Sequence, residues 1–263
     1  MILDGKIVSE DIVAETKKMD IPHGRFVVIQ IGDDRISNLY VQKKQELALE
    51  LKVDFEVKKF KDTTSEDQLL KVIEELNQDE YIGGILVQIP LPPAINRSKV
   101  ASAIVKKKDV DGFHYLMGED GGLLPPTVLA IDALLNFYKI EKSGKNILII
   151  GGGFLVGRPL YRFYKEMGCD ASILEKDDPN YEKKIHTADI VVVATGGGKI
   201  FSSNLFKDGA TVIDASTISQ GGKIIGDIDK NDWPHGINLA PVPGGVGPLT
   251  VAMLFSNYFK IKS

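Results

Sequence analysis

The chain has 263 residues, of which 43% are hydrophobic and 26% charged, so it can form one large domain or two smaller ones with a substantial core. Its formal net charge of −4 argues against nucleic acid or an anionic membrane as the main partner. There is no run of about 18 apolar residues to predict a membrane span, and the N-terminus MILDGKIVSEDI lacks the apolar region of a signal peptide, so we expect a cytoplasmic location.

The first half of the chain alternates between strand-like and helix-like patterns. In chain order the predicted elements are a strand at 25–31, a helix at 37–52, a strand at 53–60, a helix at 65–78, a strand at 83–89 and a helix at 96–105. Ser65 and Gln68 have the spacing of a capping box at the start of the second helix. This order predicts a mostly parallel sheet with helices on its faces.

The second half begins with a glycine-rich stretch at 115–126, which we interpret as a loop near a domain junction. The predicted elements that follow are a linking helix at 128–138, a strand at 146–150, a helix at 155–168, a strand at 170–175, a short helix near 180–186, strands at 189–195 and 211–216, and a final helix at 248–259. The strand–helix alternation therefore restarts after the loop, which predicts a second α/β unit.

The stretch IIGGGFLVGRP at 149–159 places glycines between a strand and a helix. Gly151, Gly153 and Gly157 form G-x-G-x-x-x-G, one residue longer than the usual dinucleotide fingerprint. Such a turn lets the backbone approach a phosphate at the N-terminus of the helix. Glu175, at the end of the next strand and 24 residues after Gly151, supports a dinucleotide site. The alternative is an ordinary tight turn of an α/β fold that binds no ligand.

Two adjacent residues argue oppositely about the nicotinamide cofactor. Glu175 can hold a ribose 2′-hydroxyl, which suits NAD, whereas Lys176 can neutralise a 2′-phosphate, which suits NADP. These two residues alone leave the choice open.

The stiff PVPGGVGP loop lies at 241–248, directly before the last predicted helix. Its N–H groups can face a cofactor; the alternative is that it is only a turn.

The stretch SNLYVQKK places Ser37, Tyr40 and Lys44 on one face of the predicted helix. A tyrosine and a lysine at this spacing form an acid–base pair if the face lines a cleft, and burial can lower the pKa of such a lysine. The alternative is an exposed face with an extended lysine. Short-chain dehydrogenases have the same Tyr-x-x-x-Lys spacing, but their glycine motif comes before the pair, whereas here it comes more than 100 residues later.

Polar residues follow the strand at 83–89. Gln88 lies near its carboxyl end, where ligands of α/β proteins bind, although it could simply point outward. Asp109 and Asp111 flank a valine, but no further oxygen ligands follow at metal-binding spacing. Because Cys169 is the only cysteine and the four histidines are scattered, we expect no metal site and no disulfide.

Together these stretches resemble one family across nearly the whole chain, the bifunctional methylenetetrahydrofolate dehydrogenases/methenyltetrahydrofolate cyclohydrolases. The matching motifs are S-x-x-Y-V-x-x-K at 37–44, GGILVQIPLP at 83–92, KDVDGFH at 108–114, VGRP at 156–159 and PVPGGVGPLT at 241–250. Five motifs in the same order make a specific match.

The resemblance implies an architecture and partners. It implies an α/β folate domain at 1–127, a Rossmann-type nucleotide-binding domain at 128–247, a C-terminal helix at 248–263 packing back on the folate domain, and an active cleft between the domains. It further implies tetrahydrofolate substrates, a homodimer and a role in one-carbon metabolism.

The resemblance also implies roles for individual residues. On the folate side, Tyr40 stacks on the folate, Lys44 is the central catalytic residue, Gln88 bonds near Lys44 and helps set its charge, and Asp111 anchors the pterin ring. NADP is the expected cofactor, with NAD as an alternative. The residues implied to bind it are Gly151, Gly152, Gly153, Val156, Gly157, Lys176, Thr195, Gly196 and Thr217.

Three departures from the family pattern concern the cofactor and nearby loops. Gly152 and Gly153 stand where the family often has Arg-Ser or Ala-Ser, PPTVLA at 125–130 replaces P-C-T-P-x-G, and Lys106 replaces a proline. None of them alters the four folate residues.

We therefore expect oxidation of methylenetetrahydrofolate with NADP, followed by hydrolysis to formyltetrahydrofolate. Two alternatives remain. A dehydrogenase without cyclohydrolase activity is disfavoured by Lys44 with Gln88, and a noncatalytic nucleotide sensor has no need of Tyr40 and Asp111.

Overall fold

The protein has the predicted α/β fold with parallel sheets, seen in a computed structural model that describes residues 1–198, 201–220, 223–229 and 236–261. The chain divides into two compact units. The three-stranded unit comprises Ile12–Pro126 and the described residues from Val251 onward. The five-stranded unit comprises Met1–Asp11 and Thr127–Thr250.

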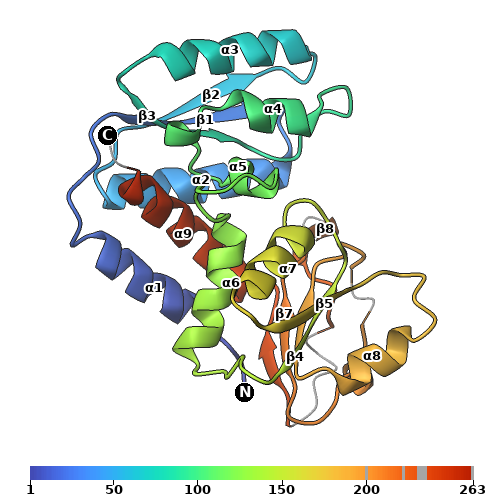
Figure 1. Ribbon diagram of the computed structural model, residues 1–263. Coiled ribbons are helices and arrows are strands. Elements are labelled where there is room, and N and C mark those ends of the chain that lie inside the picture. Colours follow the sequence, from blue (N-terminus) through green and yellow to red (C-terminus); the bar gives the residue numbers. More distant parts are fainter. Residues whose placement is uncertain (199–200, 221–222, 230–235, 262–263) are drawn as a thin grey trace. The chain divides into compact units, whose positions relative to one another are not determined.

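The three-stranded unit is built on the sheet β2-β1-β3, in which both outer strands run parallel to the central one (Figure 1). Its elements are β1 (Arg25–Ile31), α2 (Arg35–Glu50), β2 (Phe55–Phe60), α3 (Glu66–Gln78), β3 (Ile82–Val87), α4 (Arg97–Ala103), a 3-10 turn (Lys106–Lys108) and α5 (Phe113–Leu116). The capping box of α3 is confirmed, since Gln68 N donates to Ser65 Oγ at 3.2 Å and Ser65 N donates to Gln68 Oε1 at 2.9 Å.

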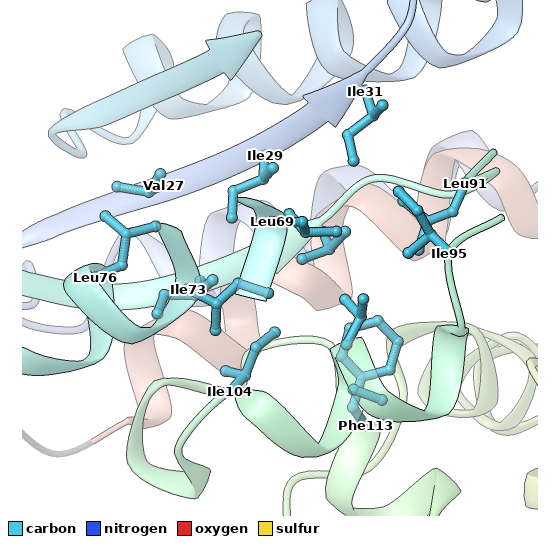
Figure 2. Packing of buried hydrophobic residues seen from close by; sticks show 14 of the residues in the cluster. Val27, Ile29, Ile31, Leu69, Ile73, Leu76, Leu91, Ile95, Ile104 and Phe113 are labelled. Carbon is cyan, nitrogen blue, oxygen red and sulfur yellow. The ribbon is translucent and has the colours of Figure 1, made fainter. Parts of the chain in front are cut away.

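Alternation along β1 supplies a core on each face of this sheet. Val27, Ile29 and Ile31 point to the face covered by α3 and α4, where they pack with residues such as Leu69 and Ile104 (Figure 2). Phe26 and Val28 lie in the cluster on the opposite face, which contains apolar residues of α2 and α9. The central strand β1 and its neighbour β3 are therefore mostly apolar and buried, as expected for strands covered on both faces, whereas the outer strand β2 carries three charged residues and is only partly buried.

The last helix, α9 (Val246–Lys260), begins in the five-stranded unit and continues into the three-stranded one. Within the latter, Phe255 and Tyr258 both contact the ring of Phe26, with ring centroids 5.5 and 5.0 Å apart respectively. The tyrosine hydroxyl donates to Gly24 O at 2.8 Å, so its polar end is satisfied although the side chain is buried.

The five-stranded unit has the sheet order β10-β7-β6-β4-β5, and each neighbouring pair is parallel. Its elements are α1 (Gly5–Thr16, which runs past Asp11), α6 (Pro126–Phe137, mostly in this unit), β4 (Asn146–Ile150), α7 (Gly157–Glu166), β5 (Asp170–Leu174), α8 (Tyr181–Thr187), β6 (Ile190–Val193), a 3-10 turn (Ser203–Leu205), β7 (Thr211–Asp214), β8 (Ile218–Gln220), β9 (Lys223–Ile225) and β10 (Asn238–Ala240). The sequence patterns do not predict α1, β10 or the antiparallel pair β8–β9, which are short or weakly periodic.

The N-terminus belongs to the five-stranded unit, whereas the expected boundary assigned residues 1–127 to the first domain. Ile2 forms a parallel bridge with Leu239, and Leu3 N donates to Leu239 O at 2.7 Å. Gly5 N donates to Gly244 O at 2.8 Å. These backbone bonds join segments more than 230 residues apart, so local sequence patterns do not indicate them.

Lys108 fastens the end of α3 to the rest of the three-stranded unit. Its side chain is buried, and Nζ donates to the carbonyl oxygens of Leu76, Asn77 and Asp79 at 2.8, 2.8 and 2.7 Å. A cation is favourable there because the last carbonyl groups of a helix lack partners and carry partial negative charge. Burial lowers the pKa of Lys108.

We expect Lys108→Met to lower the free energy of unfolding by about 2–4 kcal/mol, because it leaves three main-chain carbonyls without this donor. Urea unfolding followed by circular dichroism measures the change. Lys107→Met is the matched control at an exposed neighbouring position and should lie within about 0.5 kcal/mol of wild type. Equal stability of the two variants would show that the Lys108 bonds contribute nothing.

Candidate active site

Lys44 and Gln88 meet at the carboxyl edge of the three-stranded sheet. Gln88 directly follows β3 and remains paired with β1 through its N–H, which donates to Ile29 O at 2.8 Å. Lys44 lies on α2 with only 8% of its surface exposed, and its Nζ donates to Gln88 Oε1 at 2.6 Å. Gln88 Nε2 donates to Ile89 O at 2.7 Å, which orients the amide so that its oxygen faces the lysine.

The buried amine is electrostatically coupled to Asp111. Burial lowers the pKa of Lys44 from 10.5 to about 8, and the negative charge of Asp111 opposes this fall. Burial likewise raises the pKa of Asp111 to about 6, and the positive charge of Lys44 opposes that rise while Asp109 adds to it. With a pKa of about 8, roughly a tenth of Lys44 is neutral at pH 7, so this amine can both hold and release a proton near neutrality.

Residues 110–112, which include Asp111, lie directly against residues 123–125, and we call this close approach the neck. Gly112 has φ of +73°, and a Cβ there would lie 2.6 Å from Leu123 O, so only glycine fits. Asn257 of α9 ties both sides of the neck, because its Nδ2 donates to Val110 O at 3.1 Å and to Leu124 O at 2.9 Å. Sequence analysis missed Asn257, although a polar residue within an apolar helix could have indicated it.

Ser37 and Tyr40 share helix α2 with Lys44 but lie in different environments. Ser37 is buried, and its Oγ donates to Asp34 Oδ2 at 2.9 Å, so it helps cap the helix. Tyr40 is half-buried against the apolar cluster of this unit, with Lys43 Nζ 5.7 Å from its ring centroid. The helix thus buries Lys44 and leaves part of the Tyr40 ring available.

Asp109 is buried beside the candidate site and has a structural bond. Its Oδ2 accepts from His114 N at 2.9 Å, which stabilises the start of α5. Burial raises the pKa of Asp109. Its negative charge in turn favours the neutral form of Asp111, so Asp109 acts on the site through electrostatics.

The glycine turn of the five-stranded unit is tight where glycine is required and open where a ligand would lie. Gly151 has φ of +98°, and a Cβ at Gly157 would lie 1.9 Å from Gly151 O. Gly153 is exposed, and a Cβ there would meet no atom within 4 Å. Helix α7 begins at Gly157, and Arg158 N in its first turn donates to Gly153 O at 3.1 Å, so the open space at Gly153 lies at the N-terminus of the helix, an arrangement that fits a pyrophosphate.

Glu175 lies against this turn. A Cβ added at Gly152 would be 2.3 Å from Glu175 Oε1, so the carboxylate occupies the space of a side chain at position 152. Glu175 and Lys176 are both exposed and directly follow β5. Glu175 is therefore the side chain that an arginine at position 152 would have to displace.

The other predicted cofactor residues also lie at strand ends or helix starts of this unit. Thr195 and Gly196 are exposed and follow β6, the exposed Thr217 follows β7, and Val156 immediately precedes α7. In a parallel sheet the carboxyl ends of the strands share one edge, so these segments lie along the same edge as the glycine turn. Sequence analysis missed Asp227, whose buried carboxylate accepts hydrogen bonds from Thr195 and Gly196.

Two departures from the family pattern have local structural roles. Lys106 Nζ donates to Asp120 O, across the segment that follows Asp111. In the altered PPTVLA stretch, Pro126 is the first residue of α6, a position where proline is favoured because its missing N–H would have no helical partner.

No helix among the described residues has the length and apolarity needed to cross a membrane.

Comparisons with known proteins match both parts of the chain. Residues 3–111 match the family model for the tetrahydrofolate dehydrogenase/cyclohydrolase catalytic domain, and residues 125–263 match the model for its NAD(P)-binding domain. The bifunctional protein FolD of Hydrogenobaculum sp. (strain Y04AAS1) is 37% identical over 98% of this chain and 97% of the relative.

Solved structures show the same similarity. The bifunctional FolD methylenetetrahydrofolate dehydrogenase/cyclohydrolase of Campylobacter jejuni superposes with a TM-score of 0.91 and 33% identity, covering 99% of this chain and 98% of that one. The enzyme of Trypanosoma brucei, solved with NADP cofactor and inhibitor, superposes with a TM-score of 0.88 and 25% identity, covering 99% and 96% of the two chains.

The coupling between Lys44 and Asp111 predicts the effect of neutralising the aspartate. Asp111→Asn removes a charge that raises the pKa of Lys44, so this pKa should fall below about 8. NMR titration of protein labelled with ¹³C-lysine measures it, with Lys44→Met identifying the resonance. Glu46→Gln, on the exposed side of α2, is the control and should leave the titration unchanged. An unchanged or higher Lys44 pKa in Asp111→Asn would contradict the coupling.

Proposed function

The chain belongs to the tetrahydrofolate dehydrogenase/cyclohydrolase family, and we propose that it oxidises methylenetetrahydrofolate to methenyltetrahydrofolate with NADP and then hydrolyses this product to 10-formyltetrahydrofolate. The observation that carries the proposal is the buried Lys44 amine bonded to Gln88 and coupled to Asp111, all within the part of the chain that matches the catalytic-domain model. The match of residues 125–263 to the NAD(P)-binding domain supports the oxidative step.

In the first reaction a hydrogen leaves the methylene carbon with its electron pair, and the bound dinucleotide supplies the hydride acceptor. In the second, a water oxygen bonds to the methenyl carbon and one of the two carbon–nitrogen bonds at that carbon breaks; one of the two water protons is released, and the nitrogen that leaves the carbon gains the other. The residues of this chain have to hold the folate in place for both reactions and accept the proton in the second.

Lys44 is proposed to manage that proton. A fully cationic lysine next to a cationic substrate is unfavourable, and burial already moves the amine toward neutrality. The neutral amine accepts the proton from water, while Gln88 Oε1 orients Nζ without adding charge. This pair disfavours the alternative of a dehydrogenase that lacks cyclohydrolase activity, because hydride transfer depends mainly on positioning.

Asp111 and Tyr40 are proposed to hold the folate. An ionised Asp111 accepts charge-assisted hydrogen bonds from N–H groups of the pterin, and the neck closed by Asn257 keeps its backbone in place. The half-buried Tyr40 ring offers a face for stacking.

The five-stranded unit is proposed to bind the dinucleotide. The glycine turn and the first turn of α7 would hold the pyrophosphate, as their open backbone fits it. Lys176 would contact a 2′-phosphate, and Thr195, Gly196 and Thr217 would lie along the ribose and nicotinamide. The expected homodimer and cytoplasmic location stay predictions, supported by the resemblance and by the composition.

Lys44→Met should separate the two activities, because it keeps most of the side-chain length and removes the amine. Loss of general-base catalysis should reduce methenyltetrahydrofolate hydrolysis by about 10²–10⁴-fold, whereas a measurable part of the dehydrogenase activity remains. Methenyltetrahydrofolate should then accumulate from methylenetetrahydrofolate and NADP, which its absorbance reveals.

Lys71→Met, at an exposed position on α3, is the control for the loss of a lysine and should behave as wild type. Wild-type hydrolysis by Lys44→Met, above the spontaneous background, would refute the role of Lys44.

Cofactor preference should depend on two adjacent residues in opposite directions. Lys176→Ala removes a contact to the 2′-phosphate worth about 1.5–3 kcal/mol, so KM for NADP should rise roughly tenfold to hundredfold with little change for NAD. Glu175→Gln removes a negative charge next to Gly152, so KM for NADP should fall. Initial rates with each cofactor measure both effects, with Lys183→Ala as the exposed-lysine control. If Lys176→Ala affects the two cofactors equally, Lys176 does not contact the 2′-phosphate.

A further inference from the structure

Asp227 organises the loop that follows β6. Its side chain is fully buried, and Oδ2 accepts three hydrogen bonds, from Thr195 N at 3.0 Å, Thr195 Oγ1 at 2.7 Å and Gly196 N at 3.0 Å. Oδ1 accepts from Gly198 N at 2.8 Å. One carboxylate therefore satisfies three backbone N–H groups and a hydroxyl within four consecutive residues.

Asp227 is itself held at the end of β7. Its N–H donates to Ser216 Oγ at 2.7 Å, and that hydroxyl donates to Asp214 Oδ1 at 2.5 Å. Ile228 N donates to Asp214 Oδ2 at 3.0 Å. A Cβ at Gly226 would lie 1.9 Å from this same oxygen, so the segment before Asp227 passes directly against β7.

Burying two carboxyl groups costs free energy of folding, so the arrangement indicates that the loop has to keep one conformation. Asp214 and Asp227 are both fully buried. Burial raises the pKa of Asp214 to about 6, and the charge of Asp227 adds to the rise. In return, the loop is held with Gly196 and Gly198 in the left-handed region, at φ of +69° and +73°, while Thr195 and Gly196 remain exposed.

We propose that Asp227 is a positioning residue for the dinucleotide, which holds Thr195 and Gly196 in the conformation that contacts it. The inference rests on the proposed function, which assigns these two residues to the cofactor.

The direction of the Thr195 hydrogen bond adds a chemical restriction. The hydroxyl has one proton, and it donates this proton to Asp227. Thr195 Oγ1 can therefore only accept a hydrogen bond from the ligand. Its partner on the dinucleotide has to be a donor, which restricts the choice to a ribose hydroxyl or to the amino group of the carboxamide or of the adenine, and excludes a phosphate oxygen.

The test uses the full-length protein and separates cofactor binding from folding. Asp227→Asn replaces one acceptor oxygen with a donor that faces backbone N–H groups. We expect the dissociation constant of NADPH, measured by its fluorescence, to rise at least tenfold. KM for NADP in the dehydrogenase assay should rise by a similar factor. Hydrolysis of methenyltetrahydrofolate supplied directly needs no dinucleotide and should stay within twofold of wild type.

Asp189→Asn is the matched control. Asp189 lies in the same unit and also accepts a backbone hydrogen bond, from Asn146 N at 2.9 Å, but it directly precedes β6 and so lies at the opposite edge of the sheet. It should leave the dissociation constant of NADPH unchanged. An unchanged constant in Asp227→Asn, or an equal rise in both variants, would overturn the proposal.

Two milder variants keep the proposal testable if Asp227→Asn does not fold. Ser216→Ala removes the hydroxyl that anchors Asp227 and should weaken NADPH binding several-fold with hydrolysis retained. Thr195→Val should weaken binding, whereas Thr195→Ser, which keeps the hydroxyl, should restore it. Wild-type binding in both Ser216→Ala and Thr195→Val would refute the positioning role. A wild-type protein that binds NADPH but turns over no folate would instead contradict the proposed function.

Discussion

The hydrogen bond between Lys44 Nζ and Gln88 Oε1 places an amine in the interior, where apolar side chains would otherwise fill the space between α2 and the sheet. Its position depends on two independent constraints. Helical spacing puts Lys44 on the same buried face of α2 as Ser37 and Val41, and pairing with β1 holds Gln88 at the end of β3. The price of burying the amine is partly offset by the amide oxygen and by the charge of Asp111.

Each unit places its candidate residues at the carboxyl edge of its own parallel sheet. In the three-stranded unit this edge carries Gln88, and in the five-stranded unit it carries the glycine turn, Glu175, Thr195 and Thr217. Parallel strands all end on the same side, and the connections that leave them are free of the core, so they can change without loss of the sheet. Buried polar residues such as Asp227 then restrict the conformations that these connections adopt.

Each departure from the family pattern is matched by a local feature of the structure. Glu175 fills the space beside Gly152, so a larger residue there would have to displace this exposed carboxylate. Lys106 reaches Asp120 O and thereby links the two sides of the segment that follows Asp111. Pro126 is the first residue of helix α6, a position that proline favours. None of these changes reaches the bond between Lys44 and Gln88.

The sequence by itself determined the α/β class, most helices and strands of both units, the glycine turn and the family, because periodic patterns and motifs are local properties of the chain. It also placed Lys44 on a helix face with Ser37. It did not indicate that the first residues pair with β10, or that Asn257 and Asp227 hold loops distant in sequence. Only the tertiary structure decided those contacts and the shifted pKa values of Lys44 and Asp111. The physical reason is that burial and charge coupling depend on which segments meet in space, and these segments come from distant parts of the chain.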